Sequence, residues 1–302
     1  MAALEVLFDP ILPVSFILAV GFVMGRMGWV AEAEARAINR LAMTVFIPLL
    51  VGGLIAAAPV EDFSAPGIGW YFVTEVVLFG AGYILATRVL KRERGEAVLL
   101  AFCGVFANTV FFTLPMGILL YGKDQIVPIT AVLTLDSAVA FCAVMFALQL
   151  IRLGRASPGA ILRTLVRTPV LVAVAVGTAV NLSGLPVPAA VDTFIHFNGA
   201  AAPPIALFAL GVILSRTSFR FDPAVLIFSA VKLLAFPLMV FAGIAALMPQ
   251  QADLRQFVLA SAGPSGAMGF SMALLYGIRT DAIAQIIILT SALSILVLAV
   301  LA

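Results

Sequence analysis

Three ionisable side chains lie inside long hydrophobic stretches of the sequence: Glu75, Asp136 and Lys232. Each charge placed inside a membrane costs a few kcal/mol, so such residues usually have a buried partner or a function. Asp136 lies between Thr134 and Ser137, and we predict ion coupling at Asp136, Thr134 and Glu75. Lys232 is predicted either to contact an anion or to replace a bound cation. The alternative interpretation of these residues is a buried structural ion pair.

Two other apolar stretches, residues 105–122 and 260–277, carry helix breakers at their centres and end in the same Leu-Leu-Tyr-Gly. An unpaired backbone amide in hydrocarbon costs several kcal/mol, so a helix breaks there only where protein or a water-filled cavity receives the freed groups. A matched pair of breaks indicates a transport site, with half-helix N-termini facing an anion. The alternative is an ordinary proline kink. The predicted substrate-binding residues are Asn108, Pro115, Lys232, Ser261, Pro264 and Ser265.

Composition identifies the broad class of protein. Of 302 residues, 63% are hydrophobic and 11% are charged, and the mean hydropathy is +1.19. These values indicate an integral membrane protein, and the net charge of +2 gives no reason to expect a nucleic-acid partner. The sequence has one histidine, His196, and two cysteines within apolar stretches, so we expect no metal site and no cofactor. We also expect no enzyme, because no nucleophile with a base and no P-loop is present.

The hydrophobic stretches are each close to the roughly 20 residues that cross a bilayer. Fourteen of the seventeen Lys and Arg residues lie in alternate connections, which places those connections in the cytoplasm and both termini outside it. The expected location is therefore the inner cell membrane, spanned many times. The ten predicted spans cover residues 10–29, 38–58, 68–90, 97–121, 126–151, 170–185, 191–214, 224–248, 257–276 and 282–302.

The chain also repeats itself. Residues 13–28 match residues 169–184 at six of sixteen positions, and nearly the same offset places Glu75 beside Lys232. Five spans per half is an odd number, so the second half must enter the membrane from the opposite side. The predicted fold class is an all-α membrane protein of ten helices in two inverted five-helix repeats, with broken helices 4 and 9 crossing. The predicted division is 1–152 for the first repeat, 153–168 for a cytoplasmic linker and 169–302 for the second repeat.

Several stretches together resemble the auxin efflux carrier family, which includes plant PIN proteins and bacterial malonate and malate permeases. The two broken stretches carry the resemblance most clearly, with the sequences NTVFFTLPMGILLYG and GPSGAMGFSMALLYG. The resemblance covers both halves of the chain. The stretches that carry it are residues 39–48, 108–122, 199–211, 232–237, 263–277 and 290–298.

The resemblance implies a ten-helix carrier similar to bile-acid sodium symporters, commonly a homodimer, which moves small organic anions held near the crossing of helices 4 and 9. The long cytoplasmic loop of many plant members is missing here, which favours a dicarboxylate such as malate or malonate over auxin. A coupling ion would be sodium or a proton. The alternative function is a sodium/proton antiporter of similar fold, and a membrane-embedded enzyme or a passive channel fits the residues less well.

Overall fold

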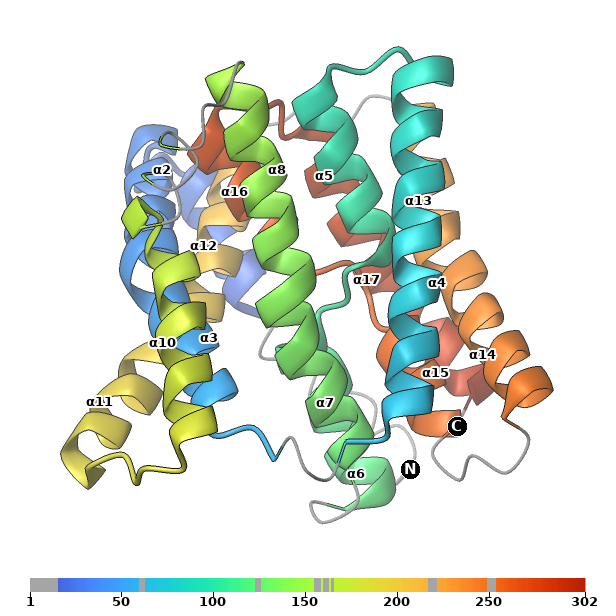
Figure 1. The fold of residues 1–302 in the computed structure, drawn as a ribbon. Coiled ribbons are helices and arrows are strands. Elements are labelled where there is room, and N and C mark those ends of the chain that lie inside the picture. The colour runs from blue at the N-terminus through green and yellow to red at the C-terminus, as the bar shows by residue number, and fades with distance from the viewer. Residues whose placement is uncertain are drawn as a thin grey trace.

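The computed structural model describes residues 16–59, 63–122, 126–154, 159, 163, 166–216, 222–248 and 254–301. All regular elements within these residues are helical, which confirms the predicted all-α class (Figure 1). Five of the described helices are long and apolar enough to cross a membrane, and three shorter apolar helices accompany them. The protein is therefore a multi-pass membrane protein. The five long helices are Glu32–Ala56, Ala65–Val89, Val127–Leu153, Ala189–Leu214 and Pro223–Leu247.

One side of the bundle is formed by helices that approach each other closely through glycine (Figure 1). A side chain added at Gly211 or at Gly21 would collide with backbone of the opposite helix, and Gly177 lies against the backbone of Gly52. Small residues allow this approach, which supplies packing energy between helices in lipid. We call this group of helices the glycine-packed side. Its helices are Phe16–Arg26, α2 (Glu32–Leu41), α3 (Ile47–Ala56), α10 (Pro169–Ser183), α11 (Ala189–Gly199) and α12 (Ala202–Leu214).

The other side of the bundle has an aromatic core. Tyr71, Phe236 and Phe257 are buried together, and the Tyr71 and Phe236 rings lie 5.1 Å apart. Several of these helices contain one π-helical turn, in which an extra residue is inserted into the helix. The helices are α4 (Ala65–Ile84), α5 (Arg94–Val105), α6 (Leu114–Tyr121), α7 (Val127–Leu135), α8 (Phe141–Leu153), α13 (Pro223–Ala230), α14 (Phe236–Leu247), α15 (Leu254–Ala262), α16 (Met268–Tyr276) and α17 (Asp281–Leu301). The π-helical turns on this side are Leu85–Val89, Thr109–Thr113, Asp136–Ala140 and Val231–Ala235, and a further one, Ala42–Phe46, joins α2 to α3 on the glycine-packed side.

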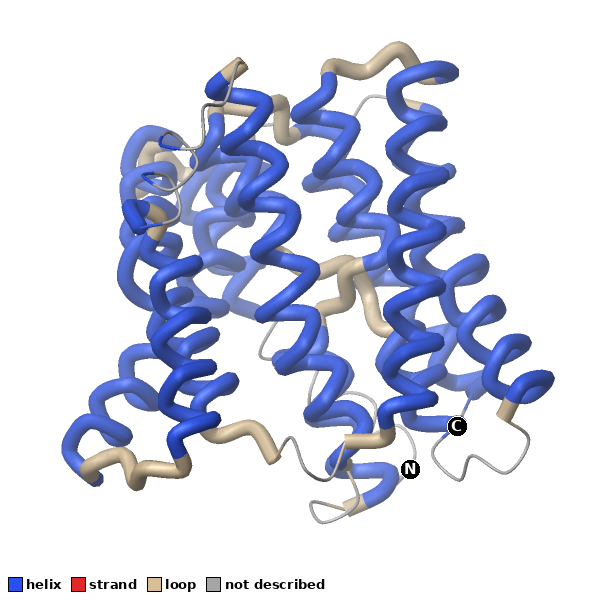
Figure 2. Tube along the Cα trace, in the orientation of Figure 1, coloured by secondary structure: helices blue, strands red, loops and turns tan. Residues whose placement is uncertain are grey.

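The two stretches with predicted breaks are interrupted and contact each other. Helix α5 ends at Val105 and the chain resumes helical geometry at Thr109, while residues 263–267 separate α15 from α16. The backbone amide of Asn108 donates a hydrogen bond to the Pro264 carbonyl (2.8 Å), and the backbone amide of Gly266 donates to the Phe106 carbonyl (3.1 Å). Figure 2 shows these two loop segments at the centre of the bundle. Each break thus pairs backbone groups that the other break leaves free.

An ion-pair cluster joins two connections at one end of the bundle. The Arg92 guanidinium contacts both carboxylate oxygens of Asp222, at 2.5 and 2.6 Å, and the Glu96 carboxylate at 3.1 Å. Asp222 in turn accepts a hydrogen bond from the Ala224 amide and caps α13. The α4–α5 and α12–α13 connections, both rich in arginine in the sequence, therefore lie at the same end of the molecule.

Candidate functional site

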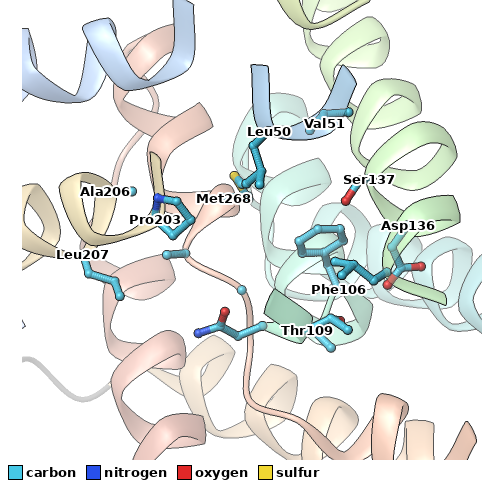
Figure 3. A pocket seen from close by; sticks show the side chains of 15 residues that line it. Leu50, Val51, Phe106, Thr109, Asp136, Ser137, Pro203, Ala206, Leu207 and Met268 are labelled. Atoms are coloured by element: carbon cyan, nitrogen blue, oxygen red, sulfur yellow. The ribbon is translucent and has the colours of Figure 1, made fainter. Parts of the chain in front are cut away.

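A cavity of about 40 Å³ lies where the two breaks meet. Its walls come from both breaks, from the π-helical turn that begins at Asp136, and from α3 and α12 on the glycine-packed side. Figure 3 shows Asp136 and Ser137 on one side of the cavity and Pro203, Ala206 and Leu207 on the opposite side. This volume holds about three water molecules. The lining residues are Leu50, Val51, Phe106, Ala107, Asn108, Thr109, Leu133, Asp136, Ser137, Pro203, Ala206, Leu207, Gly266, Ala267 and Met268.

Two half-helix N-termini begin at this cavity. The helical turn that starts at Thr109 leads into α6, and Ala267 precedes the first residue of α16. The first amides of a helix lack partners within the helix and carry part of the positive end of its dipole. Asn108 lines the cavity beside them and adds a side-chain amide that can donate to an anion. This part of the cavity can therefore bind a small negatively charged group.

Lys232 contacts the C-terminal end of a broken helix, whereas the cavity lies at helix N-termini. Its side chain is 0% exposed, and Nζ donates a hydrogen bond of 2.6 Å to the Ser261 carbonyl. Helix α15 ends at Ala262, so the Ser261 carbonyl belongs to the last turn and has no partner within the helix. The ammonium group also lies 4.8 Å from the centre of the Phe236 ring. Lys232 thus places a positive charge on the C-terminal end of a broken helix, where a free cation would otherwise be favoured.

Glu75, Asp136 and Lys232 form one buried cluster. Glu75 is 4% exposed and Asp136 is 1% exposed, and both interact electrostatically with Lys232. The two carboxyl groups also interact with each other as a hydrogen-bonding pair, which requires a proton on one of them, and neither has another described donor within hydrogen-bond distance. The hydroxyl group of Tyr71, one turn before Glu75, is buried and unpaired in the same region. The structure therefore brings together the three intramembrane charges that the sequence singled out.

The other site residues predicted from sequence make hydrogen bonds within or beside the two breaks, or lie near them. The Ser261 hydroxyl donates to the Val258 carbonyl, and the Pro264 carbonyl accepts from Asn108. The Ser265 amide donates to Thr290 Oγ1 at 3.0 Å, while the Thr134 hydroxyl is buried without a described partner. Of the predicted substrate-binding residues, only Asn108 lines the cavity; Asp136, predicted for ion coupling, lines it as well. The backbone of Pro115 lies in α6, and its side chain lies outside the described residues.

Sequence reasoning did not select several residues of the site. Met268, Pro203 and Leu207 line the cavity, but ordinary apolar residues carry no signal that separates them from other residues of a membrane span. Tyr71 had a usable signal, because a residue four positions before Glu75 lies on the same face of a helix. Thr290 and Ser291 are adjacent in an apolar helix. Nothing in the sequence reveals which of the two hydroxyl groups accepts a hydrogen bond from another segment.

We expect Thr290→Val to reduce stability by about 1–3 kcal/mol, because the buried Ser265 amide would lose its acceptor. The measurement is the midpoint of thermal unfolding in detergent. Ser291→Ala is the matched control, since the Ser291 hydroxyl donates only to the Ile287 carbonyl of its own helix. Equal midpoints for the two variants would contradict the role assigned to Thr290.

The chain is similar to known proteins over almost its whole length. The family model described as "membrane transport protein" matches residues 6–155 and 153–302. The chain is 22% identical over 306 residues to a putative malonate transporter of Rhizobium meliloti, covering 94% of this chain and 91% of that protein. It is 25% identical over 280 residues to the uncharacterized transporter YfdV of Escherichia coli, covering 89% and 88%. It is also 24% identical over 293 residues to an uncharacterized transporter of Methanothermobacter thermautotrophicus, covering 95% and 94%.

Proposed function

Since this chain belongs to the membrane transport protein family, the auxin efflux carrier family that its motifs resemble, we propose that it is a secondary transporter for a small organic anion. The proposed substrate is a carboxylate such as malonate or malate, or an auxin-like acid. The similarity to a putative malonate transporter over 94% of the chain supports the first choice. Family and relatives are described as transporters rather than enzymes.

The observation that carries this proposal is the meeting of Asn108, two half-helix N-termini and Asp136 at one cavity. The amide groups would bind the carboxylate of the substrate. An ionised Asp136 lining the same cavity would repel that carboxylate, and in a medium of low dielectric constant the repulsion is large. Binding of the anion is therefore favoured when Asp136 has been neutralised. This linkage between an anion and a positive ion is the basis of coupled transport.

We propose a proton as the coupling ion, taken up by Asp136, with sodium as the other candidate. Lys232 already supplies a positive charge at the C-terminal end of α15, so this helix end needs no additional cation. Glu75 and Thr134 would tune the affinity of Asp136 for the coupling ion, since Glu75 interacts with Asp136 directly and the Thr134 hydroxyl is buried without a described partner. No cofactor is part of the proposal.

The proposed mechanism is alternating access around the crossing breaks. The chain would form ten spans in two inverted five-span repeats, with the junction in residues 153–168. A cavity of about 40 Å³ is too small for a dicarboxylate, so it must widen before substrate enters. Its walls come from two groups of helices, with Pro203 and Leu207 of α12 facing Asp136 of the other group. Movement of one group against the other would open the cavity alternately to the two sides of the membrane.

The proposed location is the inner cell membrane with both termini outside the cytoplasm, as the distribution of arginine and lysine predicts. A homodimer is proposed through the glycine-packed side, because the moving helices would then remain free. The partners of the protein are thus the lipid bilayer, a second copy and the organic anion.

The test is uptake of labelled malonate, malate and indole acetate into proteoliposomes with an imposed pH gradient, sodium gradient or membrane potential. Accumulation of one carboxylate driven by the pH gradient supports the proposal. Accumulation driven by the sodium gradient would identify sodium, not the proton, as the coupling ion. The second candidate function is sodium/proton antiport, which the buried Asp136 beside two helix breaks also suits. Sodium-driven proton flux without movement of any organic anion would favour the antiporter function over organic-anion transport.

Asn108→Ala is expected to raise the KM for the transported anion about tenfold, because a hydrogen bond to a charged group contributes about 1.5 kcal/mol or more. The measurement is the concentration dependence of initial uptake. Asn198→Ala is the matched control, since the Asn198 amide donates to the Phe194 carbonyl on exposed helix α11. An unchanged KM in Asn108→Ala would remove this residue from the binding site.

A further inference from the structure

A buried hydrogen bond joins the two sides of the bundle outside the central cavity. The Asn39 side-chain amide on α2 donates to the Ser271 carbonyl on α16, at 3.1 Å. Helix α2 belongs to the glycine-packed side and α16 to the other side, and Figure 1 shows them as neighbours. The side chains of Trp70, Asn181 and Tyr276 also bond to distant segments, but both segments then lie within one side. The bond made by Asn39 therefore opposes movement of one side against the other.

Asn39 is a polar residue on the buried face of its helix. Of the ten residues of α2, Ala35 and Asn39 are buried, and they share a face because they are four positions apart. The other residues of α2 are partly or fully exposed. A buried amide costs free energy unless it is hydrogen-bonded, so the partners of Asn39 matter for the packing of α2 on α16.

The same two residues hold an unused donor and an unused acceptor. Asn39 is 1% exposed and Ser271 is 0% exposed, and neither Asn39 Oδ1 nor Ser271 Oγ has a described partner. A hydroxyl group donates and an amide oxygen accepts, so these two groups are complementary. A side chain added at Gly269 would collide with Cys103 of α5, and Ser271 lies about 200° further round the helix. The Ser271 hydroxyl therefore lies on the half of α16 that is turned away from α5, and Asn39 reaches the backbone of the same residue.

We propose that Asn39 is a positioning residue that holds α16 in two alternative places. In this structure its amide N–H donates to the Ser271 carbonyl. Once α16 has moved along α2, the amide oxygen of Asn39 accepts a hydrogen bond from the Ser271 hydroxyl instead. Each arrangement makes one of the two hydrogen bonds, so the interface has two discrete positions of similar free energy.

This switch acts on the anion site through α16. Ala267 and Met268, at the N-terminal end of α16, line the central cavity, so the position of α16 sets the position of one half-helix N-terminus. The inference rests on the proposed alternating access and names two residues that control it.

The test measures the populations of the two conformations by pulsed electron paramagnetic resonance. Spin labels replace Asp192 on α11 and Asp281 on α17, which are both exposed and lie on the two different sides. Both native cysteines are changed to alanine in every variant. Labelled protein is reconstituted with an excess of unlabelled protein, so that distances within one chain are measured. No substrate is added, so the result does not depend on which anion, if any, is transported.

Ser271→Ala removes only the hydrogen bond of the alternative conformation. We expect it to raise the population of the conformation described here about fivefold relative to the alternative, the effect of one ordinary hydrogen bond. Asn39→Leu removes both bonds, so adding Ser271→Ala to Asn39→Leu is expected to leave the ratio unchanged. A serine with a purely structural role would have the same effect in both backgrounds. Asn39→Ala, which also removes both bonds, replaces Asn39→Leu if that variant does not fold.

Ser294→Ala is the matched control, because the Ser294 hydroxyl is also buried but donates to the Ser291 carbonyl of its own helix. It is expected to leave the ratio of the two conformations unchanged. An unchanged ratio in Ser271→Ala, including a single population in every variant, would overturn the proposal. A shift that persists in the Asn39→Leu background would also overturn it, because Ser271 would then act through another residue.

Discussion

Lys232→Met is expected to destabilise the protein by about 3–5 kcal/mol, the usual effect of removing one partner from a buried charge cluster. The substitution keeps the volume of the side chain but leaves the Ser261 carbonyl without its donor. It also leaves Glu75 and Asp136 without the positive charge that both interact with. The measurement is the thermal unfolding midpoint in detergent, together with the monodisperse fraction after size-exclusion chromatography.

The combined variant Lys232→Met, Asp136→Asn and Glu75→Gln separates charge balance from packing. Replacing a complete buried charge cluster by neutral groups usually costs much less than breaking it, so this variant is expected to recover most of the lost stability. Lys91→Met on the exposed surface serves as the control for the loss of a lysine. A combined variant that is no more stable than Lys232→Met would show that the charges do not act as a cluster.

Asp136→Asn is expected to abolish accumulation driven by the pH gradient while exchange of labelled for unlabelled anion continues. The amide removes the negative charge that opposes the substrate in the central cavity, so anion binding no longer requires a positive ion. The measurement compares uptake under an imposed pH gradient with counterflow at equal pH on both sides.

Asp192→Asn is the control for this variant, because Asp192 lies on exposed helix α11 and pairs only with His196 among the described residues. It is expected to leave both gradient-driven uptake and exchange unchanged. If Asp136→Asn still accumulates the anion in response to the pH gradient, the proton must bind elsewhere, and Glu75 becomes the candidate.

The sequence allowed the helical class and the two breaks to be predicted because both have strong local signals. Proline, glycine and small polar residues are unusual at the centre of an apolar stretch, and Glu75, Asp136 and Lys232 are unusual inside one. The matched spacing in the two halves also indicated that the breaks belong together. The pairing of Asn108 with Pro264 follows that expectation.

The partners of individual polar groups could not be predicted, because they depend on packing between distant segments. Lys232 donates to a carbonyl 29 positions away, and nothing in the sequence separates Ser261 from other residues near the second break. The π-helical turns could not be predicted from the sequence either. One begins at Asp136 and another contains Lys232, and each inserts a residue that changes the direction of the following side chains.

The hydrogen bonds between the two breaks also affect how the protein is made. Asn108 and Pro264 are 156 positions apart, so the first half of the chain leaves the ribosome well before its partner exists. At synthesis rates of about 5–20 residues per second, the backbone amide of Asn108 waits roughly 8–30 s for its acceptor. During this time water, the insertion machinery or a chaperone must satisfy the exposed backbone. The newly made first half therefore exposes an unpaired backbone amide until the second half follows it.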